Sequence, residues 1–155
     1  MQIQLLNVAQ KLPDWVDSGC AEYLRRMPRE LGLQLTTVPL VKSASRLSAD
    51  VRREREGKQL LAKLRPGLSI ALDERGECWS SSDWADQLQG WMRNYGQVNL
   101  LIGGPDGLSG ECLQACQQRI SFGRMTLPHA LVKLVVLEQL YRAWTICSGH
   151  PYHRE

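Results

Sequence analysis

Three short stretches of this sequence carry residue types that could do chemistry. LLIGGPDGLS, residues 100–109, leads an apolar run through glycines and a proline to a helix-capping serine. ISFGRMTLP, residues 120–128, is a second glycine-interrupted stretch, and GHPYHRE, residues 149–155, holds two of the three histidines. Glycine lets backbone approach a ligand closely, and histidine changes charge near neutral pH. These stretches could supply two binding loops and a titratable tail.

The two glycine stretches favour a ligand pocket of the kind that open α/β sheets form beyond the carboxyl ends of their strands. A branched side chain at Gly104 would there occupy space that the ligand needs. Residues 100–109 lack the Gly-Lys-Ser/Thr ending of a P-loop and the G-x-G-x-x-G pattern of dinucleotide-binding folds. Taken alone, this stretch could also be an ordinary tight turn.

Metal chemistry and serine chemistry are not favoured. His150 with His153, and Cys112 with Cys116, could each supply two ligands, but neither pair belongs to a four-ligand zinc pattern. Cysteines at helical spacing are more often core residues. No serine lies in a Gly-x-Ser-x-Gly elbow. We therefore expect neither a metal site nor a serine hydrolase.

The elements that would position these residues alternate along the chain. Short apolar strands are expected at 3–9, 33–40, 68–74 and 98–104, with an extended segment at 119–128. Helices are expected at 14–27, up to about 64 after a serine-rich connection at 40–48, at 83–93, after Ser109, and at 129–147. Continuous apolar strands between helices predict an α/β fold, a mainly parallel sheet with helices on both faces. We expect one domain over residues 1–155.

The composition is that of an ordinary globular protein, with 43% hydrophobic and 23% charged residues. No stretch is long and apolar enough to span a bilayer, and the first residues lack the features of a signal peptide. The five cysteines are odd in number and scattered, unlike a secreted disulfide framework. We expect a cytoplasmic protein with reduced thiols and no membrane partner.

Positive charge is concentrated in residues 1–66, which hold 12 Lys/Arg against 7 Asp/Glu, whereas the remainder holds 7 against 9. Such a surface could contact RNA phosphates. The alternative is a solvated helix surface, because Glu54 and Glu56 interleave with the arginines, and charge alone favours that alternative. The candidate RNA contacts are Arg25, Arg26, Lys42, Arg46, Arg52 and Arg53.

The expected helix 129–147 is apolar around most of its circumference, and Glu138, Arg142 and Thr145 leave one narrow polar stripe. A helix of this kind buries both of its sides. One side would meet the sheet and the other a second copy of the chain, which predicts an isologous homodimer. The alternatives are a helix wholly buried in one subunit, and a Glu138–Arg142 pair that only stabilises the helix.

Four motifs together resemble those of a known family. They are LDERG (72–76), LLIGGPDGLS (100–109), MTLPHALVKLVVLEQLYRAWTI (125–146) and GHPYHRE (149–155). They are similar to motifs of the 23S rRNA (pseudouridine) N3-methyltransferases, minimal members of the SPOUT class, and the similarity spans the whole chain. The resemblance implies methylation of N3 of a pseudouridine in large-subunit ribosomal RNA. It also implies S-adenosylmethionine as cofactor and the assembled ribosome as partner.

The resemblance further implies an α/β knot, in which the C-terminal segment threads a loop to form a trefoil, an exception to unknotted topology. The cofactor would lie bent in the knot, held mostly by the backbone of three loops. FGRM, residues 122–125, departs from the family pattern, but backbone contacts would survive such changes. The implied cofactor contacts are Leu72, Gly103, Gly104, Phe122, Gly123, Arg124, Met125, Thr126 and Leu127.

In that family the tail and knot of one subunit help to close the site of the other. Methylation at N3 requires loss of the N3 proton, which His129 or His153 could accept. An arginine, Arg142 or Arg154, could stabilise the resulting anion. A non-catalytic module that binds RNA or the ribosome is the alternative function, and a nucleotide-binding oxidoreductase is disfavoured. The catalytic candidates are His129, Glu138, Arg142, Tyr152, His153 and Arg154.

Overall fold

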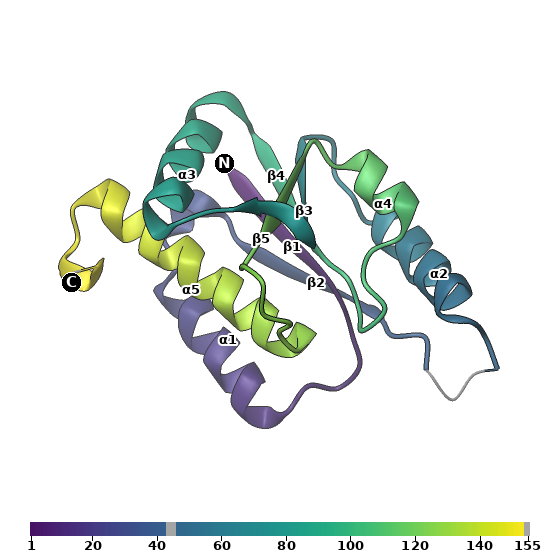
Figure 1. The fold of residues 1–155 in the computed structure, drawn as a ribbon. Coiled ribbons are helices and arrows are strands. Elements are labelled where there is room, and N and C mark those ends of the chain that lie inside the picture. The colour runs from purple at the N-terminus through teal and green to yellow at the C-terminus, as the bar shows by residue number, and fades with distance from the viewer. Residues whose placement is uncertain (43–45, 154–155) are drawn as a thin grey trace.

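Five strands form one parallel sheet within residues 1–42 and 46–153, the part of the chain that the computed structural model describes. The strands are β1 (Gln2–Ala9), β2 (Gln34–Pro39), β3 (Leu68–Cys78), β4 (Gln97–Ile102) and β5 (Gln118–Ser121). Their order across the sheet is β2-β1-β4-β3-β5 (Figure 1). The predicted parallel sheet is confirmed.

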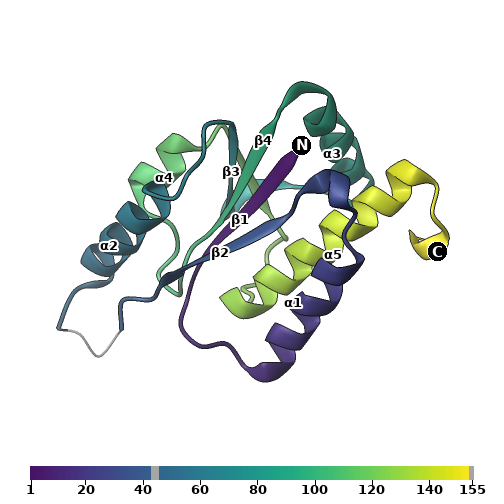
Figure 2. The same ribbon diagram turned by 180° about the vertical axis from the view of Figure 1, so that it is seen from behind.

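Helices cover both faces of this sheet. They are α1 (Asp14–Arg26), α2 (Ala49–Leu61), α3 (Ser81–Asn94), α4 (Gly110–Ala115) and α5 (His129–Ser148). In Figures 1 and 2, α1, α3 and α5 lie on one face, and α2 and α4 lie on the other, with a buried apolar cluster in each layer. Because β1 and β4 are covered on both sides, nearly all of their residues are buried, including the polar Gln4, Asn7 and Asn99. The predicted α/β class is confirmed.

Local sequence signals set the start of α3 and the end of α5. At the start of α3, the Asp83 N–H donates to Ser80 Oγ at 3.1 Å, and the Ser80 N–H donates to Asp83 Oδ2 at 2.7 Å. This reciprocal pair is a capping box. Gly149, with a φ of 69°, ends α5 in the left-handed conformation that glycine adopts at little cost.

Two strand boundaries differ from those expected. β3 continues to Cys78, because after an irregularity between Leu72 and Glu77 it pairs with β5 again. β5 ends at Ser121, so the segment 119–128 is a strand only at its start. Two short 3-10 helices, η1 (Arg29–Leu31) and η2 (Pro151–His153), have no counterpart among the predicted elements.

The strand order brings three loop segments to one edge of the sheet. Leu72 of β3 pairs with Ile102 at the end of β4 on one side and with Ile120 of β5 on the other. Regular pairing of these three neighbouring strands therefore ends at the same level, and β3 pairs with β5 again only after the irregularity. In parallel α/β sheets this carboxyl edge is where ligands bind.

The long helix α5 packs against the sheet and lies between α1 and α3. Thr145, expected in a polar stripe, is fully buried, and its hydroxyl donates to the Arg142 carbonyl oxygen at 2.7 Å. Glu138 and Arg142 are half-buried, as are Leu131, Val135 and Ile146, so this helix is not wholly covered within one subunit. Among the helices described, none combines the length and apolar character needed to cross a membrane.

Candidate functional site

A tight glycine turn, residues 103–107, follows β4. The Gly107 N–H donates to the Gly104 carbonyl oxygen at 2.9 Å, and Gly107 has a φ of 82°. A side-chain carbon added at Gly103 would lie 2.5 Å from the carbonyl carbon of Gly107. Glycine at 103 and 107 is therefore what allows the chain to fold back directly after the strand.

A cleft of about 620 Å³ opens at the carboxyl edge of the sheet, between the glycine turn, the LDERG stretch and the segment after β5. Its volume lies within the usual range of small-molecule sites. Gly103 does not line the cleft, because it packs against Gly107. The other eight implied cofactor contacts do line it, and they are Leu72, Gly104, Phe122, Gly123, Arg124, Met125, Thr126 and Leu127.

Charged residues that the sequence analysis did not single out also line the cleft. Asp73 accepts a hydrogen bond from Arg75 Nε at 3.1 Å. Burial acts to raise the pKa of Asp73, but its hydrogen bonds with Arg75 bring it below the usual value. Their place in the LDERG motif, next to Leu72, was the signal that could have found them. Within the described residues, no three His, Cys, Asp or Glu side chains lie close enough together to hold a metal ion.

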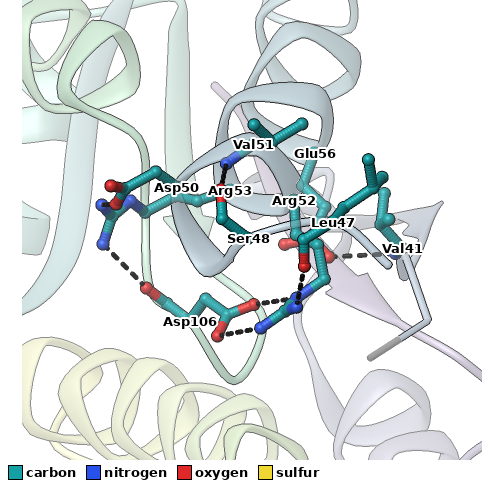
Figure 3. Close-up of polar contacts among 9 residues, drawn as sticks. All are labelled: Val41, Leu47, Ser48, Asp50, Val51, Arg52, Arg53, Glu56 and Asp106. Atoms are coloured by element: carbon teal, nitrogen blue, oxygen red, sulfur yellow. Dashed lines mark hydrogen bonds and ion pairs between the residues drawn. The ribbon is translucent and has the colours of Figure 1, made fainter. Parts of the chain in front are cut away.

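Two arginines of α2 hold the glycine turn from the opposite layer (Figure 3). Arg52 donates to Asp106 through Nε at 2.9 Å and through Nη2 at 3.2 Å, and Arg53 Nη1 donates to the Asp106 carbonyl oxygen at 3.3 Å. The hydrogen bonds from Arg52 hold the pKa of the Asp106 carboxyl below its usual value. An ionised carboxylate is therefore fixed at the cleft, and Arg53 lines the cleft beside it.

The six predicted RNA contacts do not form one patch in a single subunit. Arg25 and Arg26 lie on α1, where each pairs with Glu22 at 2.6 Å. Arg52 and Arg53 lie on α2, which covers the other face of the sheet (Figure 2). The remaining two are exposed and lie between β2 and α2, and they are Lys42 and Arg46.

Three predicted catalytic residues form a tail cluster, Glu138, Arg142 and Tyr152. Arg142 Nη2 lies 2.8 Å from Glu138 Oε1, and its guanidinium lies 5.3 Å from the centre of the Tyr152 ring. The Tyr152 hydroxyl donates to Glu138 Oε1 at 3.4 Å. Burial, with a further contribution from the hydrogen bond to Tyr23, raises the pKa of Tyr152 to about 12. This hydroxyl is therefore a proton donor, not a base, at neutral pH.

The predicted histidines lie apart from each other. His129 begins α5, one turn before Val132, which lines the cleft. Burial lowers the pKa of His129, so its imidazole is neutral and able to accept a proton. His153 lies in η2, and its buried Nδ1 has no hydrogen-bond partner among the described residues. The sixth candidate, Arg154, is outside the residues that the structure describes.

The tail cluster is separated from the cleft of its own subunit. Val132 lines the cleft, and Arg142 lies ten residues further along α5. At the helical rise of about 1.5 Å per residue, this separates them by about 15 Å along the axis. The fold of this chain therefore does not bring the tail cluster and the cleft together.

Known proteins share this architecture. A family model described as "Predicted SPOUT methyltransferase" matches residues 1–153. The structure of a probable methylase family protein from Haemophilus influenzae Rd KW20 is 15% identical, covers 99% of this chain and 70% of its own, and has a TM-score of 0.58. A probable methyltransferase from Bordetella pertussis Tohama I is 16% identical, covers 91% of this chain and 93% of its own, and has a TM-score of 0.58. These two likenesses show a common fold.

Proposed function

Because this chain belongs to the SPOUT methyltransferase family, we propose that it transfers a methyl group from S-adenosylmethionine to N3 of a pseudouridine in 23S ribosomal RNA, on the assembled ribosome. The observation that carries the proposal is the cleft at the carboxyl edge of the sheet, lined by eight implied cofactor contacts. The choice of substrate rests on the four motifs, above all the LPH helix start at 127–129 and the PYHRE tail at 151–155.

The residues of the cleft fit S-adenosylmethionine. The glycine turn and residues 122–127 offer backbone donors and acceptors, and Leu72 offers apolar surface. Asp73 and Asp106 keep ionised carboxylates at the cleft, and Arg53, Arg75 and Arg124 line it as well, so the cleft offers both signs of charge to a cofactor that carries a sulfonium, an ammonium and a carboxylate group. When bound, the cofactor supplies a methyl group that is already activated as an electrophile. The protein has then to orient the nucleophile and remove its proton.

The proton at N3 must leave before this nitrogen can attack. His129 and His153 are the two groups proposed to accept it, and the neutral state of His129 suits that role. An arginine, Arg142 or Arg154, stabilises the imide anion as it forms. The protonated Tyr152 hydroxyl and Glu138 hold Arg142 in its place.

The enzyme is a homodimer in which the tail of one subunit completes the cleft of the other. The separation of about 15 Å along α5 supports this arrangement, since the tail cluster does not reach its own cleft. The half-buried apolar residues Leu131 and Val135 on α5 supply surface for isologous pairing. The proposed trefoil knot follows from the resemblance, and it is supported by residues 122–127 and the glycine turn lining one cleft.

Mass spectrometry of 23S rRNA from a strain that lacks the gene tests this function. We expect N3-methylpseudouridine to be absent from that strain and to return when the wild-type gene is restored. Persistence of the modified nucleoside in the deletion strain would contradict the proposal. If the purified protein binds ribosomes but no S-adenosylmethionine in titration calorimetry, the non-catalytic alternative is favoured.

Charge reversal between β2 and α2 should weaken binding to ribosomal RNA. We expect Lys42→Glu with Arg46→Glu to raise Kd and to make its salt dependence shallower, because each lost phosphate contact removes counterion release. Arg25→Glu with Arg26→Glu tests α1 separately. Arg93→Glu, at an exposed position on α3 outside the predicted set, is the control. An unchanged slope of log Kd against log salt in both double variants would favour the solvated-surface alternative.

A further inference from the structure

Arg52 of α2 contacts both the glycine turn and the segment that leads from β2 into α2 (Figure 3). Its Nε and Nη2 donate to Asp106 at 2.9 and 3.2 Å, and its Nη1 donates to the Leu47 carbonyl oxygen at 2.7 Å. All three guanidinium nitrogens are thus used within the protein. Because the guanidinium is planar and rigid, it fixes the direction of both partners as well as their distance.

Glu56, one helical turn after Arg52, repeats this arrangement. Its Oε1 accepts a hydrogen bond from the Val41 N–H at 3.0 Å. Its Oε2 faces the turn, since a side-chain carbon added at Gly104 would lie 3.0 Å from that oxygen. The two α2 side chains therefore hold the segment at two places, Val41 and Leu47, while Arg52 bonds to the glycine turn at Asp106 and Glu56 fills the space behind Gly104.

The burial of Glu56 shows that packing alone does not explain this carboxyl group. The residue is 1% exposed, and its Oε2 has no hydrogen-bond partner among the described residues. Burial raises the pKa of this carboxyl. A buried acceptor without a hydrogen-bond partner lowers the free energy of unfolding, whereas an apolar side chain of similar size would not lower it. Unlike an apolar side chain, the Glu56 carboxyl group places one oxygen toward Val41 and the other toward Gly104.

α2 also supports the residues that follow the turn. Ser109 caps α4, and the Cys112 Sγ of α4 donates to the Gly57 carbonyl oxygen of α2 at 3.5 Å. The glycine turn is thus held at Asp106 and again beyond its end by one helix. A regular helix is a firmer base for a binding loop than another loop would be.

We propose that Arg52 and Glu56 are positioning residues, which keep the glycine turn in the shape that receives the cofactor. The same two side chains link the turn to the segment between β2 and α2. Through this link, binding of the cofactor and binding of RNA strengthen each other. This inference rests on the proposed function, since it takes the cleft as the cofactor site and Lys42 and Arg46 as RNA contacts. RNA bound near Lys42 and Arg46 restrains the glycine turn through Arg52 and Glu56. The turn then loses less conformational entropy when the cofactor binds, so the cofactor binds more tightly. The coupling is reciprocal.

Binding of S-adenosylhomocysteine, the unreactive product form of the cofactor, measures this coupling without turnover. We expect ribosomes from the deletion strain to lower its Kd for the wild-type protein about fivefold or more in equilibrium dialysis. Arg52→Ala should raise Kd about tenfold in the free protein and abolish the ribosome effect. Arg55→Ala makes the same charge change at an exposed position of α2. This variant should keep both the wild-type Kd of the free protein and the effect of ribosomes on it.

Two further variants separate positioning from folding. Arg52→Lys keeps the charge but not the two-pronged bond to Asp106, so its Kd should lie between those of the wild type and Arg52→Ala. Glu56→Leu removes the unpaired buried oxygen, so its melting temperature should not fall although the ribosome effect is lost. Glu54→Leu, at an exposed position, is the matched control.

A wild-type Kd together with an intact ribosome effect in Arg52→Ala would overturn the inference. A lowered melting temperature with unchanged Kd would also overturn it, because the role would then be structural only. A wild-type protein that binds S-adenosylhomocysteine without any ribosome effect overturns the coupling and leaves the proposed function standing. A wild-type protein that does not bind the ligand at all overturns both.

Discussion

Replacing Gly104 by valine is expected to abolish S-adenosylmethionine binding while the protein stays folded. A side-chain carbon at this position would lie 3.0 Å from Glu56 Oε2 and 3.1 Å from both Leu40 Cδ1 and Val8 Cγ1. The two methyl groups of valine have no room behind the turn, so the turn must shift toward the cleft. The physical reason thus differs from the one expected from the sequence, because the displaced backbone, not the new side chain, closes the cleft.

Titration calorimetry should detect no binding by Gly104→Val at concentrations that saturate the wild type, a loss of about 10²-fold or more. Circular dichroism and thermal melting should show a folded protein, destabilised by about 1–3 kcal/mol through overpacking. Gly110→Val is the matched control, because nothing lies within 4 Å of a carbon added there. Undiminished cofactor binding by Gly104→Val would place the cofactor outside this cleft.

Truncation after Gly149 is expected to lower turnover far more than cofactor affinity. The removed residues include Tyr152, which lies against Arg142, and His153, a proposed proton acceptor. These groups act on the imide anion that forms in the transition state, and they do not line the cofactor cleft of their own subunit. Loss of such interactions lowers kcat while Kd for the cofactor stays nearly constant.

The truncated protein should remain folded. The sequence predicts no loss for the core, but the structure shows the Tyr152 ring packed on Tyr141 at 4.8 Å, edge to face. We therefore expect a loss of about 1 kcal/mol from this aromatic pair. Single-turnover methylation of ribosomes from the deletion strain measures the chemical step, and calorimetry measures cofactor affinity. A truncated enzyme that methylates at the wild-type rate would refute the role of the tail.

Two single substitutions and one mixture sharpen this test. His153→Ala should lower kcat about 10²-fold or more if His153 is the base, and much less if it only positions the nucleotide. His150→Ala is the comparison for positioning alone, because His150 Nδ1 accepts a hydrogen bond from the Tyr152 N–H at 3.2 Å. Mixing equal amounts of the truncated chain and Gly104→Val should restore about a quarter of the wild-type activity, since about half of the dimers are then mixed and each has one intact cleft served by one intact tail. No recovery, or an active monomer in sedimentation, would contradict the dimeric site.

The sequence by itself determined the fold class and several element ends. Helices cover both faces of the sheet, so the short strands β1 and β4 are mainly apolar, which is why they were located correctly. The capping box at Ser80 and the stop at Gly149 depend on a few adjacent residues, so local signals were sufficient. The two glycine stretches favoured a pocket at this edge, and the family resemblance implied most of the residues that line the cleft.

Only the tertiary structure decided which of these residues meet. Asp106 lies 54 positions from Arg52 along the chain, and within the sequence Arg52 is one of several arginines on a polar helix. Its bidentate bond to the glycine turn depends on how α2 packs against the sheet, which no local pattern encodes. Glu56 similarly counted as a solvated charge in the sequence and is buried in the structure, because the segment near Val41 and the turn near Gly104 cover it.

The tail shows the same division. The sequence places Tyr152 and His153 after a helix stop and thereby marks them as candidates for chemistry. In the structure, Tyr152 packs against the C-terminal half of α5, beside Tyr141 and Glu138, and it does not line the cleft of the same chain. The identity and order of functional groups are written in the chain, but the distance between them is set by the register of parallel strands and the direction of a rigid helix. Those depend on packing contacts between residues far apart in the sequence.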